Sequence, residues 1–521
     1  MAPRTIPTIF LLVLSLWQWG SACSASSAEA VGNSCVQCHA TKISGFATGH
    51  VFGASNCVSC HAGDSTATAE DKAHVELIAF PGELGNAMHS CGGCHSDKVA
   101  SVANSLMHTG RGIVDVTRRL IDGTSGPQDT INFQSLGDSV ADSLLRKQCA
   151  SCHLGQSKTE HRHDVMRDRG GGCLACHIND YPDNAHPALT VHVSDARCFG
   201  CHSRSGRISL SYTGLAEVDA SATTGKRSAL RLPDGRPVER KPADVHYLAG
   251  MSCIDCHTGV GLMGIANHAT HQRDAVDISC TDCHQNNRSP MGAANFLATE
   301  KNHTRLSHIE QRTDGLWLHT KNTGRLLKIP NLDPSHHAED TDHDRLECVT
   351  CHSQWAPQCF GCHIDYDPNG KQWDHIERVD TDGRWTEQRS DVRNGLAALG
   401  VNQRDRVDLF VPGMIMTVAH PDWDKDKFVR VFGTLSPHTT GPSRTCVSCH
   451  RSSAALGLGQ GEITDQQGEK HFVPAFERLQ DTLPLDAWTN LEHSLGGHGP
   501  VEGQRPLTRD EMESVLNAPL E

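Results

Sequence analysis

Eleven copies of the sequence Cys-x-x-Cys-His are the part of this chain best suited to chemistry. They use 22 of its 23 cysteines, and Cys23 is the one left over. The paired cysteines are Cys35 and Cys38, Cys57 and Cys60, Cys91 and Cys94, Cys149 and Cys152, Cys173 and Cys176, Cys198 and Cys201, Cys253 and Cys256, Cys280 and Cys283, Cys348 and Cys351, Cys359 and Cys362, and Cys446 and Cys449. The histidines that end the copies are His39, His61, His95, His153, His177, His202, His257, His284, His352, His363 and His450.

Three chemistries compete for a Cys-x-x-Cys pair. A zinc site needs two such pairs or distant histidines, and it places no demand on the next residue. A redox disulfide needs one pair at the start of a helix. Covalent haem attachment needs both thiols for thioether bonds and a histidine directly after them as the proximal iron ligand. Because histidine follows all eleven pairs, the spacing indicates haem.

With these motifs the chain resembles the multihaem c-type cytochromes, as an undecahaem member whose motifs extend from residue 35 to residue 450. The resemblance implies eleven covalent haem c groups, with the motif histidines as proximal ligands. It also implies the fold class, which is mostly coil with short α-helices wrapped around a haem chain. Small β-hairpin insertions complete this expectation. In this family the haems carry electrons.

The second axial ligand of each iron must come from the 23 histidines outside the motifs. Two spacings recur, ten to fourteen residues after one motif or five to nine residues before the next. A histidine five to nine residues before its own attachment cysteines is better placed to serve a neighbouring haem, which would connect adjacent haems. The candidates are His50, His74, His108, His192, His246, His268, His271, His343, His375 and His438. Among His336, His337 and His343 the choice stays open. Mostly bis-histidine ligation predicts low reduction potentials, since methionine is the ligand that raises them.

The two closest motifs end at His352 and begin at Cys359, with only six residues between them. So short a connection cannot hold two haems far apart, so we expect their rings to lie near contact. Trp355 and Pro357 would stiffen the link. Repeated along the chain, this arrangement would form an electron-conducting row of haems.

The N-terminus has the features of an export signal. Arg4 precedes an apolar stretch, Ile9 to Trp19, that is too short to span a bilayer. Two cleavage sites compete: Ala28 to Ala30 fits ordinary cleavage, whereas the small residues before Cys23 fit a lipoprotein signal with Cys23 as the lipidated first residue. We therefore expect an exported protein of the periplasm, outer membrane or cell surface, without a transmembrane span in the mature chain and with a lipid anchor as one alternative.

The composition supports a cofactor-filled interior and limits the partners. Only 37% of the residues are hydrophobic and 5% aromatic, so eleven porphyrins would supply the missing apolar surface. The net charge of −14 disfavours nucleic-acid binding, which needs a basic patch. The expected partners are redox proteins or an external electron acceptor.

The spacing of the motifs predicts four regions. These are an export signal (residues 1–30), a six-haem region (31–205), a four-haem region with hairpin insertions (206–375) and a β-containing region with the eleventh haem (376–521). Turn residues predict hairpins within 229–238 and 316–329, and β-rich runs between 408 and 432 suggest a small sheet. Capped helices are expected from about Ser135 to Cys149 and from Thr508 to Leu516.

Three functions fit these residues. The first is electron relay in respiration or extracellular electron transfer. The second is an oxidoreductase of a small nitrogen or sulfur compound, which would need one haem with an open coordination site. The third is a filament-forming cytochrome subunit, whose haems would share ligands between subunits. The isolated motif Cys446 to His450 could be a terminal port for electrons or the open catalytic haem.

Overall fold

The computed structural model describes residues 33–40, 56–157, 170–179, 186–203, 209–219, 230–264, 269–284, 297–332, 343–491, 499 and 501–520. The apolar N-terminal segment, Cys23, His50, His268, His336 and His337 lie outside these residues. The chain divides into two compact units. The smaller comprises Met1–Pro81 and Asn179–Leu189, and the larger comprises Gly82–Ile178 and Thr190–Glu521.

Most helices are only one or two turns long. The described part of the smaller unit contains α1 (Ser34–Cys38), α2 (Val58–His61) and α3 (Glu70–Ala73). The α-helices of the larger unit are α4 (Leu84–Ser90), α5 (Gly92–Ala103), α6 (Leu106–Thr109), α7 (Arg111–Ile121), α8 (Val140–Lys147), α9 (Asp195–His202), α10 (Ser209–Tyr212), α11 (Val245–Ala249), α12 (Cys253–Cys256), α13 (Gly259–Met263), α14 (Gln272–Ala275), α15 (Thr281–His284), α17 (Cys348–His352), α18 (Val447–His450) and α19 (Arg509–Asn517). Short 3₁₀ helices are η3 (Gln128–Thr130), η4 (Phe133–Ser135), η5 (Cys149–Cys152) and η8 (Gly172–Ala175). Such short helices depend on tertiary contacts, because isolated helices of this length are unstable in water.

The helix expected before Cys149 is present as α8, but its cap differs from the expectation. Ser139 is the N-cap, and its hydroxyl accepts a hydrogen bond from the amide of Asp142 at 3.2 Å. Ser135 instead ends η4. The capping box at Thr508 and Glu511 is confirmed at the start of α19.

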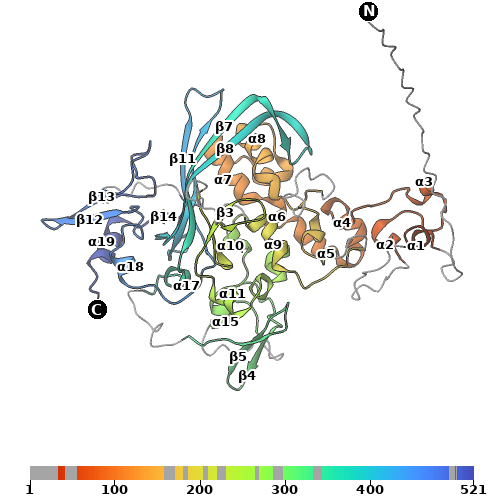
Figure 1. The fold of residues 1–521 in the computed structure, drawn as a ribbon, viewed down its shortest axis with the longest axis horizontal. Coiled ribbons are helices and arrows are strands. Elements are labelled where there is room, and N and C mark those ends of the chain that lie inside the picture. Colours follow the sequence, from red (N-terminus) through yellow and green to blue (C-terminus); the bar gives the residue numbers. More distant parts are fainter. Residues whose placement is uncertain are drawn as a thin grey trace, which may run out of the picture. The chain divides into compact units, whose positions relative to one another are not determined.

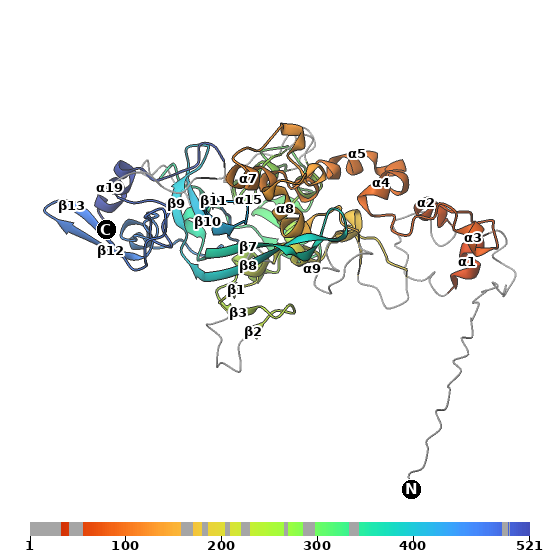
Figure 2. The same ribbon diagram turned by 90° about the horizontal axis from the view of Figure 1, so that it is seen from above.

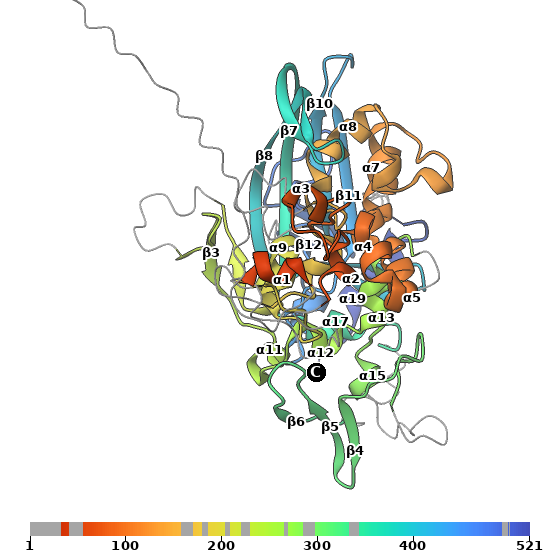
Figure 3. The same cartoon turned by 90° about the vertical axis from the view of Figure 1, so that its right-hand side faces the viewer.

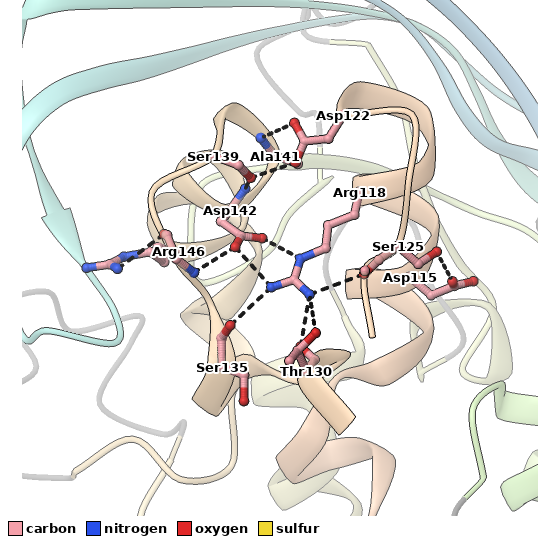
Figure 4. A network of polar contacts seen from close by, with 12 residues as sticks. Asp115, Arg118, Asp122, Ser125, Thr130, Ser135, Ser139, Ala141, Asp142 and Arg146 are labelled. Atoms are coloured by element: carbon pink, nitrogen blue, oxygen red, sulfur yellow. Dashed lines mark hydrogen bonds and ion pairs between the residues drawn. The ribbon is translucent and has the colours of Figure 1, made fainter. Parts of the chain in front are cut away.

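A buried ion pair joins α7 to α8 (Figure 4). The guanidinium of Arg118 donates to both carboxylate oxygens of Asp142, at 2.7 and 2.9 Å. It also donates to the carbonyls of Thr130 and Ser135, at 2.9 and 3.1 Å. Because a buried charge is tolerated only when it is paired and hydrogen-bonded, this network fixes α8 and with it the entry to Cys149.

The largest sheet has six strands in the order β14-β9-β10-β7-β8, with β11 also paired to β10. Its strands are β7 (Ala356–Asp374), β8 (Val379–Gly395), β9 (Ala398–Val401), β10 (Val407–Ala419), β11 (Lys427–Thr434) and β14 (Arg505–Pro506). Strands β7 and β8 form an antiparallel hairpin, whereas β7 and β10 are parallel. Figure 3 shows the long strands β7, β8, β10 and β11 side by side. The sheet suggested between 408 and 432 is therefore confirmed at β10 and β11, but the long β7–β8 hairpin was not predicted.

Among the described residues, three smaller sheets also belong to the larger unit. Their strands are β1 (Leu215–Glu217), β2 (Leu230–Arg231) and β3 (Pro237–Arg240); β4 (Ile309–Arg312), β5 (Gly315–His319) and β6 (Leu326–Lys328); and β12 (Gly461–Gln466) and β13 (Glu469–Pro474). The predicted hairpins are confirmed as β2–β3 and β5–β6. Figure 2 shows the β12–β13 hairpin beside α19.

A conventional apolar core surrounds the largest sheet. Trp488 is fully buried, and its ring stacks on Phe410 and Phe432 with centroids 4.6 and 5.3 Å apart. The β7–β8 hairpin packs on α7 and α8 (Figure 1), with Trp385 among the buried residues of this contact. Among the described residues, no helix is long and apolar enough to cross a membrane.

Candidate haem-binding sites

Ten of the eleven motifs lie on a helical turn. The backbone amide of the motif histidine usually donates to the carbonyl of the first cysteine, as from His257 to Cys253 at 2.9 Å. The helical motifs occupy α1, α2, the start of α5, η5, η8, α9, α12, α15, α17 and α18. In such a turn, residues three and four apart lie on the same face. Both thiols and the imidazole can therefore reach one porphyrin.

The eleventh motif, Cys359 to His363, has a different backbone because it lies inside strand β7. Cys362 is paired with Arg389 of β8 and with Met416 of β10. Neighbouring side chains of a strand point to opposite faces of the sheet. Cys362 accordingly packs against the apolar cluster of the β7–β8 hairpin, whereas His363 is exposed. This arrangement does not fit a porphyrin that is held by the sulfur and ligated by the imidazole from one side.

Six motif histidines face a second histidine from elsewhere in the chain. Two imidazoles on opposite sides of one metal, with metal–nitrogen bonds of about 2 Å, place their ring centroids about 6 Å apart. The pairs are His39 with His74 and His61 with His186, both at 6.1 Å; His153 with His108 at 5.0 Å; His257 with His438 at 6.1 Å; and His284 with His246 and His450 with His343, both at 6.0 Å. Five of the six separations match bis-histidine ligation of an iron between the rings.

The closest pair shows how the ligating atoms converge. The amide nitrogen of Gln134 lies 2.9 Å from Nε2 of His153 and 3.0 Å from Nε2 of His108. Both Nε2 atoms therefore lie beside one small polar group, which is also 3.4 Å from Nδ1 of His108. A metal would take the place of this amide, which would have to move aside.

Hydrogen bonds at Nδ1 leave Nε2 available for a metal at many of these histidines. His61, His284 and His450 donate from Nδ1 to the carbonyls of Ile78, Pro330 and Val515, at 2.8, 3.1 and 2.7 Å. Further Nδ1 contacts join His177 to Thr190, His186 to Pro187, His192 to Lys321, His246 to Asp244, His352 to Gly441 and His438 to Ser436. Such bonds fix the tautomer and the orientation of metal-ligating histidines.

Burial lowers the pKa of two of the paired motif histidines, His153 and His257. Desolvation, followed by the charge of His108, lowers the pKa of His153 to about 3. Desolvation and then His438 lower the pKa of His257 to about 4. Because only the neutral imidazole offers a lone pair to a metal, both residues are in the ligating form at pH 7.

Five of the predicted second ligands face a motif histidine in this way, namely His74, His108, His246, His343 and His438. Each of the five faces a motif other than the nearest one, which is what the argument for histidines placed before a motif expected of His246, His343 and His438. His343 lies opposite His450, whereas His336 and His337 lie outside the described residues. His186 was missed, because it lies nine residues after His177 and outside both expected windows.

Three other candidates are placed differently. His192 is exposed and bonds through Nδ1 to Lys321, without a ring contact to another described residue. The amide of His271 donates to the carboxylate of Asp274 at the start of α14. His375 lines a cavity together with His153, although His108 already faces that ring. These three stay predictions.

The thiols of separate motifs in the larger unit lie close to one another. Hydrogen bonding from Cys91 raises the pKa of Cys173, and hydrogen bonding from Cys198 likewise raises that of Cys253. A third such contact, between Cys280 and Cys348, lowers the pKa of Cys348 to about 6. In a haem-loaded protein these sulfurs would be thioethers without a titrating proton. What the contacts indicate is that the attachment sites of two motifs are adjacent.

Further contacts connect these pairs into one continuous row. The amide of Gly172, next to Cys173, donates to Leu154, next to His153, at 3.0 Å. Cys201 contacts the carbonyl of Cys152 at 3.9 Å. The hydroxyl of Thr258, next to His257, donates to the carboxylate of Asp277, three residues before Cys280, at 2.7 Å. The amide of Arg444, two residues before Cys446, donates to the carbonyl of Cys351 at 2.8 Å. The resulting order of motifs, named by their first cysteines, is Cys91, Cys173, Cys149, Cys198, Cys253, Cys280, Cys348 and Cys446.

Comparison of this chain with protein families, curated proteins and solved structures finds no match.

Proposed function

We propose that this protein is a multihaem c-type cytochrome that relays electrons along a row of mostly bis-histidine haems. The row of eight adjacent motifs in the larger unit is the observation that supports this most directly. A single haem protein needs no such row, and an enzyme with one reactive centre needs fewer sites. Haem c at the helical motifs would supply the one-electron redox chemistry.

The residues of the chain have three roles in this proposal. Paired thiols attach each haem, and the motif histidine ligates its iron. Histidines such as His438 and His246 close the sixth position, which excludes small substrates and favours low potentials. Carbonyls at Nδ1, such as that of Val515 at His450, hold the imidazole rings in place.

The proposed setting is outside the cytoplasm, since the N-terminus has the features of an export signal. Redox proteins or an external acceptor would exchange electrons at the ends of the row. Cys23 would carry a lipid anchor if the lipoprotein signal is used. Replacing Cys23 with Ala and fractionating the cells tests this: the variant should move from the membrane to the soluble fraction, whereas a soluble wild type would contradict the anchor.

The spin state of the oxidised protein tests the relay itself. Electron paramagnetic resonance should show low-spin signals from every haem whose motif histidine faces a second histidine. A high-spin signal that binds nitrite, hydroxylamine or sulfite would favour the oxidoreductase alternative. An intact mass without covalent haem would contradict both.

A further inference from the structure

The motif Cys359 to His363 is the one that the relay does not use. The row passes directly from the motif at Cys348 to the motif at Cys446, since the amide of Arg444, two residues before Cys446, donates to the carbonyl of Cys351 at 2.8 Å. No described contact of the row requires a haem on β7. Only the sequence pattern predicts a haem at Cys359 to His363. Whether this segment can bind haem therefore depends on its local structure.

The strand at this motif is held on both sides. Backbone pairing joins Cys359 to Val392 and Cys362 to Arg389 in β8. On the other edge, Cys362 and His363 pair with Met416 and Thr417 of β10. A helical turn at the motif would break both ladders. Since unpaired backbone groups inside a sheet are costly, the strand resists this change.

Side chains around the motif alternate in the manner of a strand. Phe360, Cys362, Ile364 and Tyr366 face the packed side, where Phe360 is buried with Phe410 and Trp488. His363, Asp365 and Asp367 lie on the other side and are exposed. This period of two is typical of a half-buried strand and cannot form one face of a helix.

The β7–β8 hairpin also stabilises α8 through contacts that require β7 to be a strand. Trp385 of β8 donates from its indole nitrogen to the hydroxyl of Ser143 in α8, at 3.1 Å. The ammonium of Lys147 donates to the carbonyl of Gly383 at 2.6 Å. The hairpin thereby supports α8, which leads into the attachment site at Cys149.

The sulfurs and the imidazole of the motif differ from those of the helical sites. Cys359 and Cys362 lie on opposite faces of the strand, where Sγ of Cys359 donates to the carbonyl of Ser390 at 3.6 Å and Sγ of Cys362 donates to the carboxylate of Glu387 at 3.7 Å. The ring of His363 is exposed. The strand therefore does not place Cys359, Cys362 and His363 around one porphyrin.

From this disagreement we infer that Cys359, Cys362 and His363 are not a haem attachment site, and that the two sulfurs remain a cysteine pair in the mature protein. This inference depends on the proposed function, because it contrasts this motif with a neighbouring motif that carries haem.

One proteolytic fragment tests the inference in the wild-type protein. Trypsin cleavage after Arg345 and Lys371 releases residues 346–371, which contain both motifs. After reduction and alkylation, we expect its mass to show one haem and two alkyl groups, with the alkyl groups at Cys359 and Cys362 in the fragment spectrum. Two haems would overturn this inference alone. No haem on either motif would overturn the proposed function as well.

Two matched double variants give a second measurement. Replacing Cys359 and Cys362 with Ser should leave the number of haems per chain unchanged, whereas replacing Cys348 and Cys351 with Ser should lower it by one. Intact mass counts the haems. Loss of one haem from the first variant would overturn the inference, and the fragment mass decides the case even where a variant fails to fold.

Discussion

Two segments only eleven residues apart contain the same motif and fold differently. Cys348 to His352 form the helical turn α17, with the Nδ1 atom of His352 donating to Gly441 at 3.0 Å. Cys359 to His363 lie in the middle of β7. The motif specifies which ligand atoms are present, but the flanking residues decide whether the backbone can gather them around one cofactor. A repeated pattern is therefore weaker evidence where its neighbours alternate in polarity.

The largest effect should come from interrupting the row at a helical site. Replacing Cys253 and Cys256 with Ser removes the attachment between the motifs at Cys198 and Cys280. With the protein tethered to an electrode through the C-terminus, near His450, the haems beyond the gap should lose fast electron exchange. Voltammetry counts the haems that respond.

The Cys359 and Cys362 double variant is the control for this experiment. Its voltammogram should keep every responding haem, because the row bypasses β7. An equal loss in both variants would contradict the order of the row and the contrast between the two segments.

Removing a histidine should have different effects at a helical haem site and at β7. Replacing His438 with Ala opens the position opposite His257, where the rings are 6.1 Å apart. One low-spin haem should then become high-spin in the electron paramagnetic resonance spectrum. Replacing the exposed His363 with Ala should leave the spectrum unchanged, and a new high-spin signal in that variant would show that β7 does carry a haem.

The sequence alone indicates which side chains could hold haem, and that indication stays a prediction. Of the second ligands that the two spacings suggested, His108, His246 and His438 each face the histidine of a motif other than the nearest one. The spacings missed His186, whose partner His61 is distant in sequence but belongs to the same compact unit. Such a contact depends on tertiary folding, which local spacing does not encode.

The fold was predictable only where local signals were strong. Turn residues indicated the β2–β3 and β5–β6 hairpins, and the β-branched runs of β10 and β11 indicated the sheet. The β7–β8 hairpin was not predicted, because the Cys-x-x-Cys-His pattern in its first strand indicates a haem site rather than a strand. The alternation from Phe360 to Asp367 was the signal that could have revealed it.

The sheet that holds β7 should depend on its apolar core rather than on haem. Replacing the buried Trp488 with Ala should destabilise this region by about 3–5 kcal/mol. Hydrogen exchange in β10 and β11 should accelerate, while the number of haems stays the same. Trp317 of β5, which is only partly buried, is the matched control. A similar loss of protection in the sheet after replacing Trp317 with Ala would contradict the assignment.

The smallest effect concerns how the helical motif at His450 is supported. The Nδ1 atom of His450 donates to Val515 of α19, and Glu511 caps that helix. Burial alone would raise the pKa of Glu511. Hydrogen bonds from Arg505 and from the amide of Thr508 outweigh this and lower it to about 2. Replacing Glu511 with Gln should therefore weaken α19 by about 1 kcal/mol.

The pH dependence of this loss follows from the lowered pKa. A carboxylate whose pKa is lower in the folded than in the unfolded chain stabilises the fold above the unfolded value, which is about 4.3 for Glu. That stabilisation disappears as the pH falls towards 2. Hydrogen exchange of α19 should thus differ between wild type and variant at pH 6 and converge near pH 2. Glu513, whose exposed pair with Arg509 contributes little, supplies the control substitution to Gln. Met512 and Leu516 of α19 belong to the same apolar cluster as Ala356 at the start of β7, so exchange at that end of β7 should follow α19. Exchange around Cys362, which β8 and β10 hold on both sides, should not respond to either change, and a response there would contradict this expectation.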